Sequence, residues 1–426
     1  MQRLTLLFGA ILLFLFSSSL ADKSEPDQSC AEPPTIIQSA RLFDGADVVP
    51  AATVIVRCSR IDRVIESAEI AEIPEGAKLI DAKGMFLLPG LIDSHVHTFR
   101  RSMLERSLDF GVTTVLDMGS LAGEFNRAID AEDAQAQAND RADMFGAVLW
   151  VTAPGSHGTK FGEVPTLDNA ANAAEFVEAR IEEGAEFIKI IYDNFKMIDR
   201  PVPTLSKETM SAVVDEAHRR GVMAVVHSRD LDAYADVVEA GIDGIAHEPV
   251  DAVPGQELLS AMKSTGTFVV PNLSLSRPEG ARLIQDPVIG PMLTEQEIKN
   301  LENYRMMARE GGDQISYDSV TAFHKFGVTI LAGSDSPNGS TIAGASLHTE
   351  LELLVEAGLS PIEAMEAATS APADKFGLDD RGRIAEGFLA DLLLVEGRPD
   401  REIADIKKIV TVWKAGKAHS RAASAD

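Results

Sequence analysis

The sequence predicts an α/β protein, a TIM-like (β/α)8 barrel with a small β-sandwich formed by the N- and C-terminal segments. Three observations support this prediction. The middle of the chain alternates apolar strands with amphipathic helices, as parallel sheets do. Both flanks contain short alternating strands separated by Gly and Asp. The length of 426 residues suits one large barrel with an appended unit. We expect the sandwich at 34–87 plus 383–420, and the barrel at 88–382.

Residues 1–21 have the features of a secretory signal peptide. Positions 1–3 form a short basic start, 4–16 are almost entirely apolar, and 19–21 supply small residues for cleavage. The apolar run is shorter than the roughly 20 residues that span a bilayer. We therefore predict cleavage and a secreted or periplasmic protein, with no stable membrane insertion once the signal is removed.

Composition excludes several classes of protein. A hydrophobic content of 45% with 25% charged residues is that of a folded, not a disordered, chain. The net charge of −27 disfavours binding to nucleic acid or to anionic membrane surfaces. The two cysteines, Cys30 and Cys58, can pair in an oxidising compartment, and two free thiols are the alternative.

The predicted elements follow in order along the chain. Strands of the sandwich are expected at Thr35–Ile37, Ala52–Val56, Arg60–Ile65, Lys78–Ile80, Ala390–Val395 and Ile409–Trp413. Barrel strands are expected at Leu88–His97, Val112–Met118, Met144–Thr152, Glu186–Tyr192, Met223–Ser228, Ile242–Glu248, Thr267–Leu273 and Val328–Asp335. Ser206, Thr294 and Ser360 are capping residues for helices, and the one at Thr294 should run to about Glu310. The long connection 274–311 is either a pocket wall or a surface excursion.

Polar residues stand at or near the ends of five of these strands. The two histidines of a His-x-His pair on the first strand face the same side, and paired imidazoles are good zinc ligands. A lysine inside the apolar fourth strand is costly unless its charge is paired or lost. Each residue alone has an ordinary explanation as a core, rim or capping residue. Because barrel strand ends meet at one mouth, the set predicts a catalytic metal centre. Its members are His95, His97, Lys189, His227, His247 and Asp335.

Several motifs occur together and in order. They are the segments 89–97, 187–189, 245–247, 333–335, 346–354, 368–373 and 387–392, together with His227. In these motifs the sequence resembles the amidohydrolase superfamily, and within it the imidazolonepropionase-like and prolidase-like branch of metal-dependent amidases and peptidases. The resemblance extends over about residues 34–420. It implies two divalent metal ions, with zinc as the expected element.

The resemblance also implies a role for each strand-end residue. His95, His97 and Asp335 would bind the more buried ion, and His227 and His247 would bind the second. Lys189 would be N6-carboxylated, which turns a buried cation into an anion that bridges both ions. Asp335 would also accept a proton and return it to the leaving amine.

The function expected from these roles is that of an exported binuclear metal-dependent hydrolase. It would cleave an amide bond, in a dipeptide or an N-acyl amino acid, by attack of a metal-bridging hydroxide. A lactone, cyclic amide or phosphoester is the alternative substrate for the same site. A catalytically inactive binding protein is the alternative of another class.

Three further residues are candidate substrate contacts. His157 lies in a segment, 155–158, that is similar to a glycine-rich histidine motif of relatives. The Tyr192 phenol could donate to a carbonyl oxygen, and the Arg229 guanidinium could clamp a carboxylate. A loop histidine and a structural salt bridge are the ordinary alternatives. We expect a small-molecule amide or peptide as partner, and a homo-oligomer is compatible with the resemblance. The remaining histidines, His218, His324, His348 and His419, are placed outside the site.

Overall fold

The computed structural model describes residues 32–68, 70, 72–120, 139–196, 201–276, 280–304 and 312–421. The predicted signal peptide and Cys30 lie outside these residues. Within them, no helix is both long enough and apolar enough to cross a membrane.

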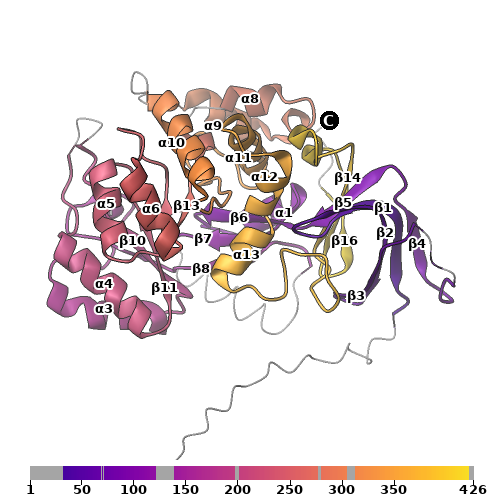
Figure 1. Cartoon of the computed structure of the whole chain (residues 1–426), viewed down its shortest axis with the longest axis horizontal. Coiled ribbons are helices and arrows are strands. Elements are labelled where there is room, and N and C mark those ends of the chain that lie inside the picture. Colours follow the sequence, from indigo (N-terminus) through magenta and orange to yellow (C-terminus); the bar gives the residue numbers. More distant parts are fainter. Residues whose placement is uncertain are drawn as a thin grey trace, which may run out of the picture.

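Strands from both ends of the chain form one eight-stranded sheet beside the barrel (Figure 1). Its order is β16 (Lys417–His419), β15 (Ile409–Lys414), β14 (Leu392–Glu396), β5 (Met85–Pro89), β1 (Thr35–Phe43), β2 (Val48–Arg57) and β3 (Arg60–Ile65), with β4 (Lys78–Asp81) paired to β1. The C-terminal β14 pairs antiparallel with the N-terminal β5. Side chains such as Leu42, Val54 and Trp413 form a separate apolar core for this sheet. We call this eight-stranded sheet the terminal sheet.

The barrel strands are parallel and close into a ring. Seven positions are filled by β6 (Leu91–Val96), β7 (Val112–Asp117), β8 (Asp143–Gly146) with β9 (Trp150–Val151) as two parts of the third strand, β10 (Phe187–Ile191), β11 (Met223–His227), β12 (Gly244–Ala246) and β13 (Phe268–Val270). The eighth position is filled by the segment around 330–336, which bridges to β13 at Ile330 and to β6 at Ser336. The predicted α/β barrel with a β-unit from both termini is therefore confirmed, and the strands expected as a β-sandwich form one eight-stranded sheet.

Two predicted strands are interrupted. Leu88–His97 breaks at Gly90, so that Leu88 and Pro89 belong to the terminal sheet, slightly beyond the expected boundary at 87. A side chain at Gly90 would lie 2.2 Å from the Thr113 hydroxyl, which explains why glycine stands at the junction. Met144–Thr152 is split around Val148, whose φ is 60°, so β8 pairs with β7 whereas β9 pairs with β10.

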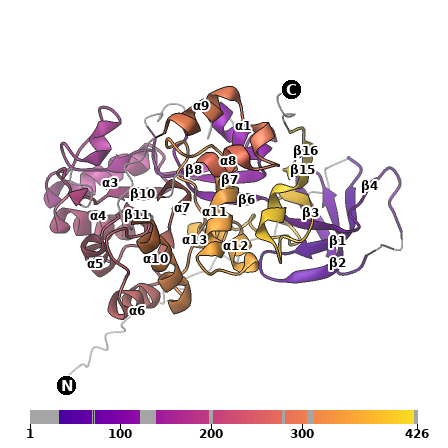
Figure 2. The ribbon, with the colours of Figure 1, turned by 90° about the horizontal axis from the view of Figure 1, so that it is seen from above.

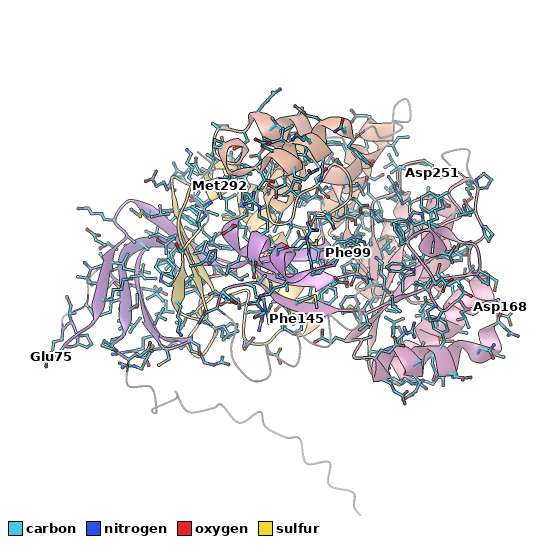
Figure 3. All side chains as sticks on the ribbon, turned by 180° about the vertical axis from the view of Figure 1, so that it is seen from behind. Glu75, Phe99, Phe145, Asp168, Asp251 and Met292 are labelled. Atoms are coloured by element: carbon cyan, nitrogen blue, oxygen red, sulfur yellow. The ribbon has the colours of Figure 1, made fainter. Side chains whose placement is uncertain are left out.

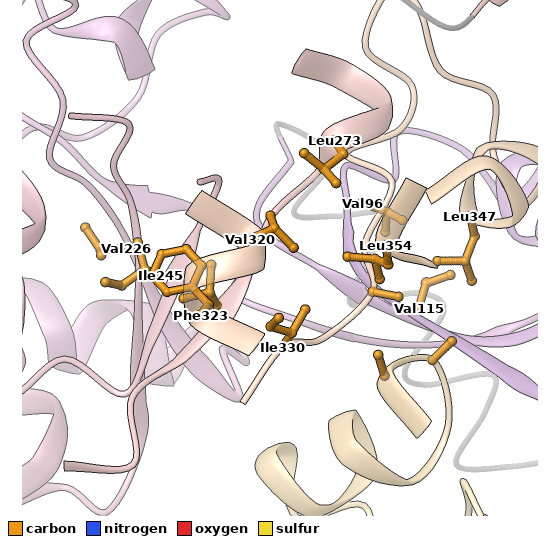
Figure 4. Packing of buried hydrophobic residues seen from close by; sticks show 14 of the residues in the cluster. Val96, Val115, Val226, Ile245, Leu273, Val320, Phe323, Ile330, Leu347 and Leu354 are labelled. Atoms are coloured by element: carbon orange, nitrogen blue, oxygen red, sulfur yellow. The ribbon is translucent and has the colours of Figure 1, made fainter. Parts of the chain in front are cut away.

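Helices surround the barrel strands (Figures 1 and 2). They are α1 (Arg101–Asp109), α3 (Ala173–Glu182), α4 (Lys207–Arg219), α5 (Leu231–Glu239), α6 (Gln256–Thr265), α10 (Gly312–Phe326), α11 (Ala345–Glu356), α12 (Pro361–Ala367) and α13 (Ser370–Phe376), with short turns η1 (His157–Lys160), η2 (Ala170–Asn172) and η5 (Ile403–Lys407). Ser206 accepts from the Thr209 N–H, and Ser360 forms a capping box, as expected. Apolar side chains such as Val226, Ile245 and Phe323 fill the space between strands and helices (Figure 4).

The long connection after the seventh strand folds into α7 (Leu273–Ser276), α8 (Gly280–Gln285), η4 (Gly290–Met292) and α9 (Glu295–Asn303). Its apolar residues, among them Leu283 and Leu301, pack with Phe110. Thr294 forms the expected capping box. The prediction that this helix runs to about Glu310 is wrong, because Tyr304 has extended backbone and ends α9.

Candidate metal centre

His95, His97 and Asp335 form the most compact group. His95 lies on β6 and His97 just beyond it, and their Nε2 atoms are 3.4 Å and 3.2 Å from Asp335 Oδ1. The Asp335 N–H donates to the His95 carbonyl at 2.7 Å, which fixes the eighth segment against β6. One ligand atom from each of the three residues falls within 4.8 Å of the others. Such a group has the size of a metal site.

Hydrogen bonds on the far side of both rings locate their protons. His97 Nδ1 lies 2.6 Å from the Gly119 carbonyl oxygen, and His95 Nδ1 lies 2.9 Å from Asn272 Oδ1. These oxygens can only accept, so each Nδ1 carries the proton in the neutral ring. Both Nε2 lone pairs then face the carboxylate of Asp335. Acceptors that converge in this way need a cation between them, and the three residues therefore fit a divalent ion.

His227 and His247 lie beside this group. Their ring centroids are 4.4 Å apart, and that of His247 is 5.1 Å from that of His95. His247 Nε2 is 3.9 Å from Asp335 Oδ2, and His227 Nε2 is 3.4 Å from Asp193 Oδ2. The ends of β6, β11 and β12 and the eighth segment therefore bring all four predicted histidines and Asp335 together.

Lys189 is buried on β10, and its Nζ has no hydrogen-bond partner among the described residues. Burial lowers the pKa of Lys189 to about 7, although the charge of Asp335 opposes this shift. In turn the lysine charge helps to lower the pKa values of His227 and His247, so the amine lies within electrostatic range of both rings. At a pKa of about 7 a substantial share of the amine is neutral near pH 7, and a neutral amine can react with carbon dioxide. The donor set of imidazoles and carboxylate fits a divalent metal centre.

The site favours an ionised Asp335 and mostly neutral histidines. Burial alone would raise the pKa of Asp335, but His95 and His97 hold it well below its ordinary value. Burial keeps the pKa values of His95 and His247 well below normal. His97 differs, because Asp335 outweighs its burial and raises its pKa. A divalent ion would take the place of the proton between these two residues.

His157 lies at the edge of the group. Its ring stacks on Phe195 with centroids 4.3 Å apart and lies 5.5 Å from the ring of His227. Burial lowers the pKa of His157 to about 3, so the ring is neutral. Its Nδ1 is buried and finds no hydrogen-bond partner in the described part of the chain. The structure thus brings His157 next to the predicted ligands.

Arg229 and Tyr192 differ in their surroundings. The charge of Arg229 helps to lower the pKa values of Asp193 and His247, and its Nε has no hydrogen-bond partner within the described ranges. The Tyr192 hydroxyl instead donates to Asp236 on α5 at 2.9 Å. Burial and this carboxylate raise the pKa of Tyr192 to about 12. The Tyr192 hydroxyl therefore binds Asp236 on the outer helix α5, whereas the charge of Arg229 affects the pKa of His247 in the histidine group.

Sequence reasoning missed four residues near the site. Asp117 is the last residue of β7, and Asp193 and Asn272 lie two residues beyond β10 and β13, the same positional signal that identified the histidines. Asp117 accepts from the Gly119 N–H at 2.7 Å and supports the loop that contacts His97. Tyr304, at the end of α9, is within range of the charges of Arg229 and Asp335, which act on its pKa. Local sequence carries no signal for Tyr304, because its place depends on how the insertion folds.

The four histidines expected outside the site have other partners. His218, His324 and His419 pair with carboxylates of Asp243, Glu363 and Asp109, and His348 contacts the Phe110 carbonyl.

Comparisons with known proteins agree with this architecture. The model of the amidohydrolase family matches residues 86–419. A Xaa-Pro dipeptidase structure with bound methionine is similar with a TM-score of 0.74 and 21% identity, covering 91% of this chain and all of that one. A prolidase structure from Bifidobacterium longum, described as putative, gives 0.73 and 24%, covering 92% and 96%.

Two sequence relatives differ in how much of their length this chain covers. An uncharacterized Mycobacterium tuberculosis protein is 25% identical over 328 residues, 70% of this chain and 77% of that protein. An adenine deaminase of Listeria monocytogenes is 24% identical over 354 residues, 80% of this chain but only 51% of the deaminase. The family match spans most of the chain. The chain therefore belongs to the amidohydrolase family and is a metal-dependent hydrolase that acts on carbon–nitrogen bonds.

Proposed function

We propose that this protein is an exported binuclear amidohydrolase that cleaves the amide bond of a dipeptide or an N-acyl amino acid. The observation that carries the proposal is Lys189, a buried amine within electrostatic range of two histidines, with a pKa lowered to about 7. A single ion held by His95, His97 and Asp335 would leave this lysine without a role. As an N6-carboxylate, Lys189 would supply the anion that a second ion needs.

The proposed ligands follow from the geometry. His95, His97 and Asp335 would hold one ion, His227 and His247 the other, and Lys189 would join them. Bound divalent ions, with zinc as our choice, would polarise the scissile carbonyl and lower the pKa of a water molecule.

Asp335 is the proposed proton carrier. Its carboxylate is ionised, because the histidines around it lower its pKa, and it lies among the groups that would hold the ions. Its buried position keeps that proton from exchanging with bulk water until the amine departs. A carboxylate that accepts first and donates later performs both halves of amide hydrolysis.

The substrate class is proposed from the groups at the edge of the site. His157 is neutral and can donate a hydrogen bond to the carbonyl oxygen. Arg229 can bind a carboxylate in two-pronged fashion. Tyr304 belongs to the insertion after the seventh strand, which supports our proposal that the insertion forms a wall of the substrate pocket. An amide with a free carboxylate nearby satisfies these groups, and the Xaa-Pro dipeptidase likeness agrees with that class.

The decisive experiment measures metal content and activity together. The wild type, Lys189→Ala and the exposed control Lys299→Ala would be analysed by mass spectrometry for bound metals. Each would be assayed on dipeptides, N-acyl amino acids, lactones, phosphoesters and adenine. We expect about two ions per chain in the wild type and control, fewer in Lys189→Ala, and turnover of the amides. Metal-free wild-type protein after reconstitution would contradict the proposal, and turnover of adenine or lactones alone would replace its substrate class.

Export is tested separately by N-terminal sequencing of protein recovered from the periplasm of a bacterial host. A chain that begins at Asp22 is expected. Full-length protein confined to the cytoplasm would refute this part.

A further inference from the structure

Helix α11 carries a buried carboxylate that the proposed mechanism does not use. Glu350 is fully buried, and its two oxygens accept from the Leu273 N–H at 3.0 Å and the Ser274 N–H at 2.7 Å. These are the first two residues of α7, and the leading N–H groups of a helix have no acceptor within it. Glu350 therefore holds the start of α7 from a helix more than 70 residues further along the chain.

The residue just before α7 contacts the metal centre. Asn272 has a φ of 68°, a conformation that asparagine tolerates better than most residues. Its Nδ2 donates to the Gly333 carbonyl at 2.8 Å, which leaves Oδ1 facing His95 Nδ1 at 2.9 Å. The orientation of Asn272 thus determines which nitrogen of His95 carries the proton.

We propose that Glu350 and Asn272 are positioning residues for the metal centre. Glu350 fixes the turn from β13 into α7, and Asn272 holds the Nδ1 proton of His95. His95 Nε2 then presents its lone pair toward Asp335. This inference rests on the proposed metal-dependent function. Partners that orient ligands in this way commonly contribute about 10- to 100-fold in metal affinity.

The choice of a carboxylate supports a positioning role. Burial raises the pKa of Glu350 to about 8, and the N–H groups of Ser274 and Leu273 oppose this shift. A serine or threonine cap supplies one oxygen to a helix start. Two oxygens on successive N–H groups fix the direction of the turn as well as satisfying the donors.

The test compares zinc affinity, measured by competition with a chromophoric chelator, and the visible spectrum of the cobalt-loaded protein. The variants are Asn272→Gly, Asn272→Asp, Glu350→Gln and the control Glu352→Gln. Glycine keeps the backbone conformation while removing the amide. Glu352 is a buried glutamate on the same helix that pairs with Arg282 at 2.6 Å, away from the α7 turn.

We expect Asn272→Gly and Glu350→Gln to weaken zinc binding about 10- to 100-fold and to change the cobalt spectrum. Asn272→Asp should retain most of the affinity, because its carboxylate still accepts from His95 Nδ1. Glu352→Gln should bind zinc like the wild type, even if its melting temperature falls. Wild-type affinity in Glu350→Gln, or an equal loss in Glu352→Gln, would overturn the inference. A wild-type protein that binds no zinc would instead overturn the proposed function.

Discussion

Two regions of the molecule bury charged groups, and they treat them differently. Between the barrel and the terminal sheet, Lys414 lies 2.7 Å from Asp143 and 2.8 Å from Asp391, and Arg381 donates to Asp143 at 2.6 Å. At the barrel mouth, Asp335 faces the lone pairs of two histidines. The Lys189 amine there finds no hydrogen-bond partner among the described residues.

The difference separates a structural cluster from a functional one. Buried charges that meet opposite charges satisfy one another, and removing one leaves the rest uncompensated. A buried amine without an acceptor, and convergent ligand atoms that share at most one proton, destabilise the protein unless a cation binds. Lys414 and Asp335 are both buried, so these groups have little freedom to rearrange. Figure 3 shows the side chains of the whole molecule on the ribbon.

Asp335→Asn should give the largest effect. We expect kcat to fall about 10²- to 10⁴-fold, because the amide cannot carry the proton to the leaving amine. Its N–H groups can donate to the His95 or His97 lone pair, so the metal-free protein should keep its stability. Steady-state kinetics and urea unfolding test both parts. An Asn variant with wild-type kcat would remove Asp335 from the mechanism.

Lys414→Met should have the opposite result, a loss of stability without a loss of activity. Leaving Asp143 and Asp391 without their shared partner should lower the free energy of unfolding by about 3–5 kcal/mol. The kcat/KM per folded molecule should stay near the wild-type value. Lys417→Met, an exposed neighbour on β16, is the control. Equal stability of the two variants in chemical denaturation would show that the cluster does not hold the sheet to the barrel.

Lys189→Met tests whether the two buried lysines, Lys189 and Lys414, contribute differently to stability. Replacing a buried amine that lacks a partner by an apolar chain of similar length should raise the stability of the metal-free protein by about 1–2 kcal/mol. Differential scanning calorimetry after chelation measures this change. A destabilised variant would mean that Lys189 is structural, like Lys414.

Two tyrosines offer a matched pair of smaller effects. Tyr304→Phe should lower kcat/KM by up to about tenfold, the loss of one hydrogen bond to substrate. Tyr192→Phe should leave kcat/KM unchanged and cost about 1 kcal/mol of stability, because its hydroxyl binds Asp236. The reverse result would restore Tyr192, the residue that sequence favours, as the substrate contact.

The smallest effect is expected at Glu363. His324 at 3.0 Å, and the Ser360 N–H at 2.7 Å, lower the pKa of Glu363 to about 2. A lowered carboxylate pKa contributes stability above the unfolded value of 4.5, and this contribution is lost as pH falls from there toward 2. Because Glu363 is 44% exposed, Glu363→Gln should cost only about 0.5 kcal/mol at pH 7. The difference from the wild type should vanish near pH 2 in denaturation curves, and a constant difference would exclude the ionic contribution.

The sequence predicted the barrel and the convergence of its histidines because both depend on local pattern. Apolar strands ending in His95, His227 or Asp335 are recognisable one at a time, and closure of the barrel then brings them together. The interruptions at Gly90 and Val148 were missed, since apolar residues continue on both sides of each break. A change of strand partner leaves no trace in hydrophobicity.

Contacts between residues far apart in the sequence could not be predicted from the sequence. Asn272 meets His95 from 177 positions away, and Glu350 meets Leu273 from 77. Neither pairing follows from spacing or propensity. Tyr192 stays a predicted substrate contact, and the bond from its hydroxyl to Asp236 of α5 is a further contact that the sequence does not reveal.

The pairing of β5 with β14 also sets the order in which the protein can be completed. The free edge of β5 at Leu88 is covered only when Leu393 of β14, some 300 positions later, pairs with it. Until the last strands are in place, β5 exposes unpaired backbone on the side that β14 covers, and this edge can pair with another chain. Folding of this protein is therefore a late event with a high contact order, and loss of residues from β14 onward would leave the finished barrel with an open sheet at its side.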